Sequence, residues 1–218
     1  MVSPYLWSRG ISRLHAVAVT HAHSDHIAGI PAVLRNFRPK ELWVGLEPPS
    51  AMLDNVLASA QSLGIRVIRR WEGDEFDFGG AHTEVFYPAR DAVVADKARN
   101  NDSMVLRASY GDTSLLLEGD AEKTVERYVT SRHPPTATLL KVGHHGSTNA
   151  TTAELVSSVR PAFAVISVGA GNSFGLPRTE ILSRLGAAGA RVYRTDLDGA
   201  TTFYLDGQFV TVSVPALQ

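Results

Sequence analysis

The chain has 218 residues, of which 44% are hydrophobic and 20% are charged, and its formal net charge is −1. This composition is ordinary for a globular enzyme, and the charge provides no overall attraction to nucleic acid or to an anionic membrane. The absence of cysteine excludes disulfides and thiolate metal sites. No apolar run approaches the ~18 residues of a transmembrane helix, and the N-terminus lacks the pattern of a signal peptide.

A cluster of potential metal ligands follows the first predicted strand. Residues 16–20 form a short apolar run, which predicts a buried strand, and residues 21–26 read His-Ala-His-Ser-Asp-His. Imidazole and carboxylate are the side chains that bind zinc, manganese or iron. Apolar residues then recur at helical spacing as far as Phe37. The cluster is therefore predicted at a strand-to-helix turn, at the carboxyl end of a strand, where open α/β sheets bind their ligands.

Strand and helix signals alternate through the rest of the chain, and no boundary divides it, so we expect one domain over residues 1–218. The predicted strands are 41–44, 65–71, 74–78, 82–87, 103–110, 113–118, 137–142, 162–168 and 192–195, with a last hairpin around 206–207. The predicted helices are 52–63, 122–130, 152–159 and 179–185. Hairpins mixed with strand–helix units indicate an α/β fold in which two sheets pack face to face with helices outside.

Two further motifs place ligand-type groups just beyond a predicted strand. The strand at 113–118 runs into Gly119-Asp120, and the strand at 137–142 runs into Gly143-His144-His145-Gly146-Ser147. Taken alone, Gly-Asp after a strand is usually a turn, whereas a His pair flanked by glycines is more informative. Three such motifs in one chain predict that their side chains meet at one edge of the sheets.

Together these motifs resemble the metallo-β-lactamase superfamily of metal-dependent hydrolases. Three further segments make the resemblance more specific: Asn100-Asn101-Asp102-Ser103, Lys141–Ser147 and Tyr193-Arg194-Thr195-Asp196. They are similar to the C-terminal hydrolase domain of ComEC competence proteins, which move DNA across bacterial membranes. The resemblance covers essentially the whole chain. It implies an αββα four-layer sandwich that holds two divalent metal ions, zinc or manganese.

The resemblance also implies a role for each motif residue. The implied metal ligands are His21 and His23 for the first ion, Asp25 and His26 for the second, Asp120 as the bridge, and His144. The ligand that follows the strand at 137–142 is either His144 or His145. His144 is preferred, which leaves His145 to contact substrate or donate a proton. Asp25 and His145 are the expected catalytic residues. The expected substrate contacts are Asn101, Ser103, Ser147 and Arg178.

The sequence departs from the family pattern in two places. Relatives carry additional strands upstream of the first metal motif, so we expect this fold to lack its first N-terminal strands. The family often has Gly-His-Pro-His after the strand at 162–168, where this chain reads Gly175-Leu176-Pro177-Arg178. Arg178 could replace part of the charge of the missing histidine. Metal binding is therefore a firmer expectation than full turnover.

These features lead to three functional hypotheses. The first is a two-metal phosphodiesterase or nuclease, acting on DNA during natural competence. The second is a metallohydrolase of a small ester or phosphodiester, and the third is a degenerate module that binds metal or DNA without catalysis. The expected partners are DNA or another phosphodiester and a membrane channel domain on the same or a neighbouring polypeptide. In a ComEC-like protein this domain is expected on the extracytoplasmic face of the membrane, and free-standing it is expected in the cytoplasm.

Overall fold

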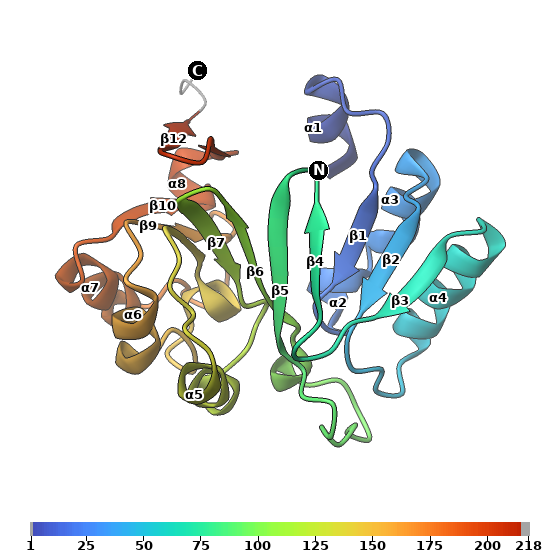
Figure 1. The fold of residues 1–218 in the computed structure, drawn as a ribbon, viewed down its shortest axis with the longest axis horizontal. Coiled ribbons are helices and arrows are strands. Elements are labelled where there is room, and N and C mark those ends of the chain that lie inside the picture. Colours follow the sequence, from blue (N-terminus) through green and yellow to red (C-terminus); the bar gives the residue numbers. More distant parts are fainter. Residues whose placement is uncertain (1, 215–218) are drawn as a thin grey trace.

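The computed structural model describes residues 2–214, which form four layers, helices–sheet–sheet–helices (Figure 1). The first half contains α1 (Val2–Ser8), β1 (Ala16–Val19), α2 (Ser24–Ile27), α3 (Ile30–Phe37), β2 (Glu41–Val44), α4 (Ala51–Ser62) and β3 (Arg66–Arg69). Strands β1, β2 and β3 pair in parallel in that order, so β1 and β3 are the edges of a three-stranded sheet. The helices α3 and α4 cover the outer face of this sheet.

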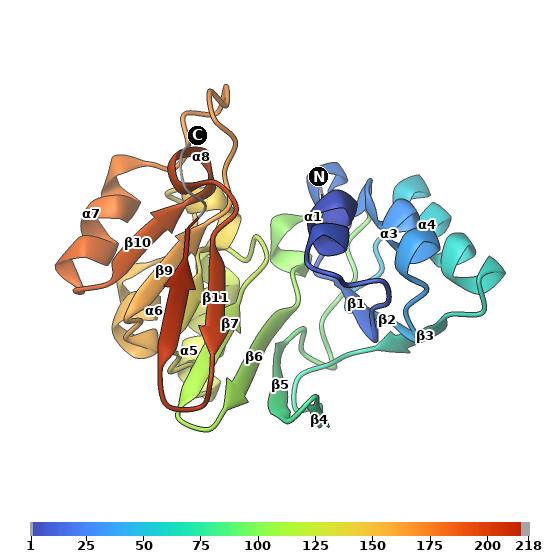
Figure 2. The same cartoon turned by 90° about the horizontal axis from the view of Figure 1, so that it is seen from above.

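The second half builds a larger, mixed sheet. The elements of this half are β4 (Glu75–Phe78), β5 (Ala81–Tyr87), β6 (Val105–Tyr110), β7 (Thr113–Leu117), α5 (Lys123–Arg132), β8 (Leu139–Lys141), α6 (Ala153–Val159), β9 (Phe163–Ile166), α7 (Thr179–Ala187), β10 (Arg191–Arg194), α8 (Thr195–Asp198), β11 (Thr202–Leu205) and β12 (Val210–Ser213). Strands β11 and β12 pair with each other in a separate antiparallel hairpin. The sheet order is β10-β9-β8-β7-β6-β5-β4, parallel from β10 to β7 and antiparallel beyond. The helices α5, α6 and α7 cover its outer face (Figure 2).

A layer of side chains joins the two sheets. Trp43 of β2 packs there against Val85 and Leu106 of the larger sheet, together with the fully buried Met104. The indole Nε1 of Trp43 donates a hydrogen bond of 2.7 Å to Glu41, so the one polar atom of this large side chain is satisfied. The residues on either side of Trp43 in β2, Leu42 and Val44, face the helices instead. This alternation is the period-two pattern of a strand buried on both faces.

The N-terminal helix α1 links the two halves of the fold. The ring of Trp7 packs 5.7 Å from the ring of Phe37 in α3. On its other side the Tyr5 hydroxyl lies 2.7 Å from Oγ1 of Thr202, and Arg9, just beyond the helix, donates to the Tyr204 hydroxyl of β11. The sequence analysis missed α1 and α8, because helices of one or two turns are too short to show a clear period. No helix within residues 2–214 is both long and apolar enough to cross a membrane.

The predicted αββα sandwich is confirmed, and most predicted elements are present with small changes at their ends. The helix expected after the first motif is divided into α2 and α3, because residues 28–29 interrupt it. The strand expected at 192–195 ends at Arg194. The carboxyl ends of β1, β7, β8 and β9 all lie on the same side of the molecule (Figure 1). This common edge is where the three sequence motifs meet.

We expect Leu140→Ala to destabilise the fold by about 2–5 kcal/mol. Leu140 lies in the central strand β8 and is fully buried against α5 and α6, so truncation removes apolar contacts and leaves a cavity. The matched control is Leu197→Ala, since Leu197 is 60% exposed; its effect should stay within about 0.5 kcal/mol. Urea unfolding of both variants measures the difference. Equal stabilities would contradict the assignment of β8 to the core.

Candidate metal centre

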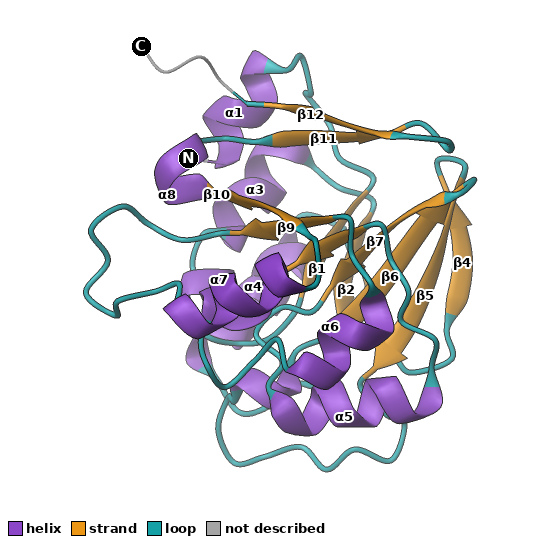
Figure 3. Cartoon of the chain, turned by 90° about the vertical axis from the view of Figure 1, so that its left-hand side faces the viewer, coloured by secondary structure: helices purple, strands orange, loops and turns teal. Residues whose placement is uncertain are grey.

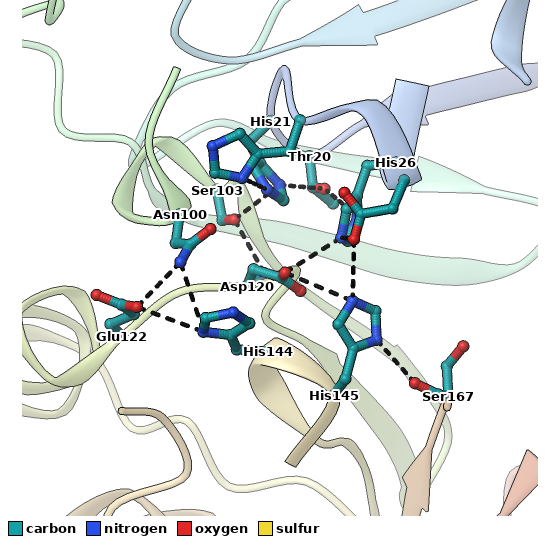
Figure 4. Close-up of polar contacts among 12 residues, drawn as sticks. Thr20, His21, His26, Asn100, Ser103, Asp120, Glu122, His144, His145 and Ser167 are labelled. Carbon is teal, nitrogen blue, oxygen red and sulfur yellow. Dashed lines mark hydrogen bonds and ion pairs between the residues drawn. The ribbon is translucent and has the colours of Figure 1, made fainter. Parts of the chain in front are cut away.

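Four ligand-type residues from three motifs converge between the two sheets. One ligand atom from each of Asp25, His26, Asp120 and His145 lies within 4.8 Å of the others. Asp25 and His26 belong to α2, directly after the strand β1 of the smaller sheet. Asp120 follows β7, and His145 lies in the 3₁₀ turn η2 (Gly143–Gly146) after β8. The cluster therefore requires both sheets, and each contributes through the carboxyl ends of its strands (Figure 4).

The donor atoms of this cluster fit a divalent metal ion. Oδ2 of Asp120 lies 3.2 Å from Nε2 of His26 and 3.5 Å from Nε2 of His145. Oδ1 of Asp120 and both of these nitrogens are buried without a hydrogen-bond partner within residues 2–214. Buried polar atoms are rarely left unpaired, and two imidazole nitrogens with two carboxylates form a common donor set for zinc or manganese.

His145, and not the preferred His144, lies in this cluster. Both residues have left-handed backbone angles, φ 43° at His144 and 53° at His145, which turn their side chains apart (Figure 4). Nε2 of His145 lies 3.5 Å from Oδ2 of Asp25. Nδ1 of His144 instead lies 3.3 Å from Glu122. The cluster of potential ligands therefore contains His145, and His144 lies outside it.

Backbone carbonyls set which nitrogen of two histidines faces the site. Nδ1 of His145 lies 2.7 Å from the carbonyl oxygen of Ser167, and Nε2 of His23 lies 3.2 Å from that of Ala98. A carbonyl oxygen can only accept a hydrogen bond, so Nδ1 of His145 and Nε2 of His23 each carry a hydrogen and donate it. Nε2 of His145 and Nδ1 of His23 are thereby left with free lone pairs. Such outer hydrogen bonds orient metal-binding imidazoles.

His21 and His23 form the second part of the site. Nε2 of His21 lies 3.1 Å from Nδ1 of His23, so the two nitrogens share one side of the cluster. The rings of His21 and His26 are 4.3 Å apart at their centroids. The first ligand pair is therefore next to the second, as the spacing of the motif predicts. His21 is almost completely buried, with 1% of its surface exposed.

A buried hydroxyl connects the two sheets beneath these ligands. Oγ of Ser103 lies 3.2 Å from Nδ1 of His21 and accepts a 2.9 Å hydrogen bond from the backbone N–H of Asp120. Gly119 makes the approach possible, because a Cβ there would lie 2.9 Å from both Ser103 Oγ and Thr20 Cβ. Its φ of +55° also favours glycine. Ser103 therefore fixes the distance between His21 and Asp120.

Burial and mutual charge shift the protonation of the ligands toward the metal-binding forms. Burial lowers the pKa of His21 from 6.5 to about 4, and the neighbouring His26 acts in the same direction. Burial alone would raise the pKa of Asp120, but the imidazoles of His26 and His145 hold it below its usual range. A neutral imidazole and an ionised carboxylate are the forms that bind a cation.

The expected substrate contacts are not all available to a substrate. Ser103 is fully buried, and its hydroxyl contacts His21 and the backbone N–H of Asp120. Oδ1 of Asn101 accepts the backbone N–H of Glu122 at 2.9 Å, so its side chain holds the loop after Asp120. The Ser103 assignment is corrected to a positioning role because the residue is buried, whereas Asn101 is partly exposed and only its Oδ1 is used within residues 2–214. Ser147 is partly exposed beside η2, and Arg178 is exposed at the start of α7.

Three positioning residues were missed by the sequence analysis. Glu122 orients His144, Thr20 lies 3.2 Å from Nδ1 of His21, and Ser167 binds His145 through its carbonyl. Glu122 and Thr20 are within two residues of a motif, so their proximity was a usable signal. Ser167 has no such signal, because it acts through its backbone and lies far along the chain.

Comparison with known proteins agrees with this geometry. The profile of the family described as "Metallo-beta-lactamase superfamily" matches residues 1–169. The chain is 33% identical to ComE operon protein 3 of Bacillus subtilis over 97% of its own length and 27% of that protein. It is 28% identical to competence protein ComA of Neisseria gonorrhoeae over 94% of its length and 27% of that protein. The chain thus spans about a quarter of these curated relatives.

A solved structure shows the same fold. The metallo-beta-lactamase fold protein YhfI of Bacillus subtilis superposes with a TM-score of 0.57, covering 97% of this chain and 83% of that one. The sequence identity is 12%, so this likeness concerns the fold alone. The competence relatives confirm the resemblance recognised from the three motifs.

We expect His145→Ala to lower metal content and His144→Ala to leave it nearly unchanged. His145 supplies an unpartnered nitrogen to the cluster, whereas His144 faces Glu122. The measurement is inductively coupled plasma mass spectrometry after reconstitution with Zn²⁺ or Mn²⁺, with circular dichroism as the control for folding. The opposite ranking would restore His144 as the ligand, and no bound metal in the wild type would contradict the site.

The contribution of His21 to the stability of the metal-free protein should be lost as the pH falls from about 6.5 to about 4. In this window the unfolded chain protonates His21 and the folded chain does not, because the folded pKa is lowered to about 4. The shift corresponds to roughly 3 kcal/mol, present above pH 6.5 and lost by pH 4. Asp120 does not contribute to the loss of stability in this pH range, because its lowered pKa affects stability only below its unfolded value of 3.8.

Urea unfolding with a chelator, at several pH values, measures this loss in the wild type and in His21→Gln. The variant has no group that titrates at this position, so its stability should fall less across the same window. Parallel pH profiles for the two proteins would show that His21 is not the residue responsible.

Proposed function

The chain belongs to the metallo-β-lactamase superfamily, and from this premise we propose that it is a two-metal phosphodiesterase that cleaves DNA. The observation that carries the proposal is the convergence of Asp25, His26, Asp120 and His145. The last three each have a buried donor atom with no hydrogen-bond partner among residues 2–214. His21 and His23 supply a second pair of nitrogens beside them. The names of the competence relatives support DNA as the substrate.

The residues divide into ligands for two ions. His21 and His23 would hold the first, Asp25, His26 and His145 the second, and Asp120 both. Bound divalent ions supply Lewis-acid stabilisation of the phosphoryl charge and lower the pKa of a water nucleophile. The carboxylate of Asp25 is well exposed at the rim, so it can accept a hydrogen bond from an attacking water and orient it toward phosphorus. Water then adds to phosphorus and gives up a proton to the Asp25 carboxylate as the bond to the leaving oxygen breaks.

In this proposal His144 protonates the leaving oxygen. Its Nδ1 lies 3.3 Å from Oε1 of Glu122, and Asn100 donates a 3.0 Å hydrogen bond to the same carboxylate oxygen. A carboxylate on one nitrogen fixes the orientation of the ring, which leaves Nε2 as the proton donor. His144 is partly exposed, and its ring centroid is 6.4 Å from that of His145. It therefore takes the acid role first assigned to His145.

A cavity beside the ligands favours a second candidate function. It has a volume of about 290 Å³ and is bounded by Asp25 and His26 on one side and by Val2 and Pro4 of α1 on the other. This volume suits a small ester or phosphodiester. The two functions differ in the substrate that the enzyme prefers, so both substrates belong in one experiment.

Metal-loaded wild-type protein should hydrolyse both single-stranded DNA and bis-p-nitrophenyl phosphate. His144→Ala should lower kcat on DNA by about 10²–10⁴-fold, because the deoxyribose alkoxide needs a proton to leave. The loss on the nitrophenyl ester should be far smaller, since nitrophenolate leaves without protonation. Steady-state rates on the two substrates, with metal content confirmed for each protein, provide the measurement.

The control is His82→Ala, which removes an imidazole paired with Asp77 on the β4–β5 hairpin, outside the cluster. Its rates on both substrates should match the wild type. A fully metallated wild type that cleaves no phosphodiester would overturn the proposal. Activity on the nitrophenyl ester alone would favour the small-substrate hydrolase, and equal losses on both substrates would remove His144 from the acid role.

A further inference from the structure

The loop of residues 169–177, between β9 and α7, projects from the molecule at the same strand ends as the metal centre (Figure 3). Phe174 is 73% exposed within it. Its immediate neighbours in the chain are Ser173 and Gly175, and Leu176 is only partly exposed. One exposed ring is too little apolar surface for a hydrophobic docking site.

The loop is held in one conformation by Asn172. Its side-chain amide donates hydrogen bonds of 3.1 Å and 2.8 Å to the carbonyls of Gly169 and Leu176. Its Oδ1 accepts the backbone N–H of Leu176 at 3.0 Å. One side chain thus ties both ends of the loop together, and Phe174 lies between them. Ordering a ring before binding reduces the entropic cost of a contact made with it.

The loop is also attached directly to the turn that carries His145. The backbone N–H of Arg178 donates a 2.9 Å hydrogen bond to the carbonyl of Gly146. Pro177 packs so closely on Gly146 that a Cβ at this glycine would lie 2.5 Å from the Cβ of Pro177. Ser167, just before the loop, accepts the hydrogen bond from His145. The position of Phe174 is therefore coupled to that of a metal ligand.

An unpaired cation accompanies the exposed ring. The guanidinium of Arg178 lies over Gly175, with Nη1 3.3 Å from where a Cβ would be. Within residues 2–214, no carboxylate forms an ion pair with Arg178 and its side chain makes no hydrogen bond. The guanidinium thus reaches the glycine that follows Phe174 in the chain. An aromatic ring and a guanidinium match the two parts of a nucleotide, a base and a phosphate.

We propose that Phe174 and Arg178 form a binding subsite for single-stranded nucleic acid, in which the ring stacks on a base and the guanidinium contacts a backbone phosphate. The inference rests on the proposed function and extends it to a part of the substrate beyond the scissile phosphate. Stacking requires an unpaired base, so the subsite selects single strands over duplexes. It reads no particular sequence, because every base presents a π face.

Binding to metal-free protein tests the subsite without cleavage. Fluorescence anisotropy with a labelled single-stranded oligonucleotide should show Phe174→Ala binding about 5- to 150-fold more weakly than the wild type. Phe174→Trp should retain affinity, because it keeps an aromatic face. With an oligonucleotide of the same length in which the bases are replaced by abasic sites, wild type and Phe174→Ala should bind alike. Arg178→Gln should weaken the binding of both oligonucleotides. It should also reduce the slope of log affinity against log salt concentration by about one.

The matched control is Phe209→Ala, which removes a ring that is 69% exposed on the hairpin before β12. It should leave oligonucleotide binding unchanged. Wild-type affinity in Phe174→Ala, an equal loss on intact and abasic strands, or no binding by the wild type would each overturn the subsite. Cleavage assays on the loaded protein separate the two proposals. Phe174-dependent binding without hydrolysis would contradict the phosphodiesterase alone, and hydrolysis unaffected by Phe174→Ala would contradict the subsite alone.

Discussion

The close approach of the two sheets at Ser103 is the constraint on which the metal centre depends. One buried hydroxyl contacts His21 from the smaller sheet and the backbone of Asp120 from the larger one. The approach is possible only because residue 119 has no side chain. Neither sheet holds enough ligands alone, so the site exists only when this contact is made. The apolar layer around Trp43 and Met104 supplies the packing that brings the sheets together.

The loops around the site do more than connect strands. The carbonyls of Ala98 and Ser167 select the free nitrogens of His23 and His145, so the ligand geometry depends on two connections that lie far apart in the sequence. Loops that border a substrate cleft are usually the mobile part of an enzyme. Here they are also part of the support of the metal ligands. A displacement of either carbonyl would therefore change the orientation of the imidazole bound to it.

The sequence was sufficient for the fold, because alternating strand and helix signals and three strand-end motifs all point to one architecture. It also located the ligand cluster, since His21 to His26 are consecutive and Asp120 follows a clear strand. It could not show which of His144 and His145 lies in the cluster, because their orientation depends on two left-handed backbone angles that no residue pattern reveals. It assigned Ser103 to the substrate for a similar reason, since burial depends on how the sheets meet. The helix α1 was missed because its stability comes from tertiary contacts with α3 and β11.

The contacts of α1 with β11 have a consequence for the order of folding. Tyr5 and Thr202 are 197 positions apart in the chain, whereas β1, β2 and β3 are sequential neighbours that pair within one stretch of the polypeptide. During synthesis the first half can build its parallel sheet while the first helix still lacks its distant partners. Contacts of such large sequence separation form late and slow the final step. A nascent chain released before β11 would therefore leave the first helix only partly packed, and this exposed segment would be open to chaperones and proteases.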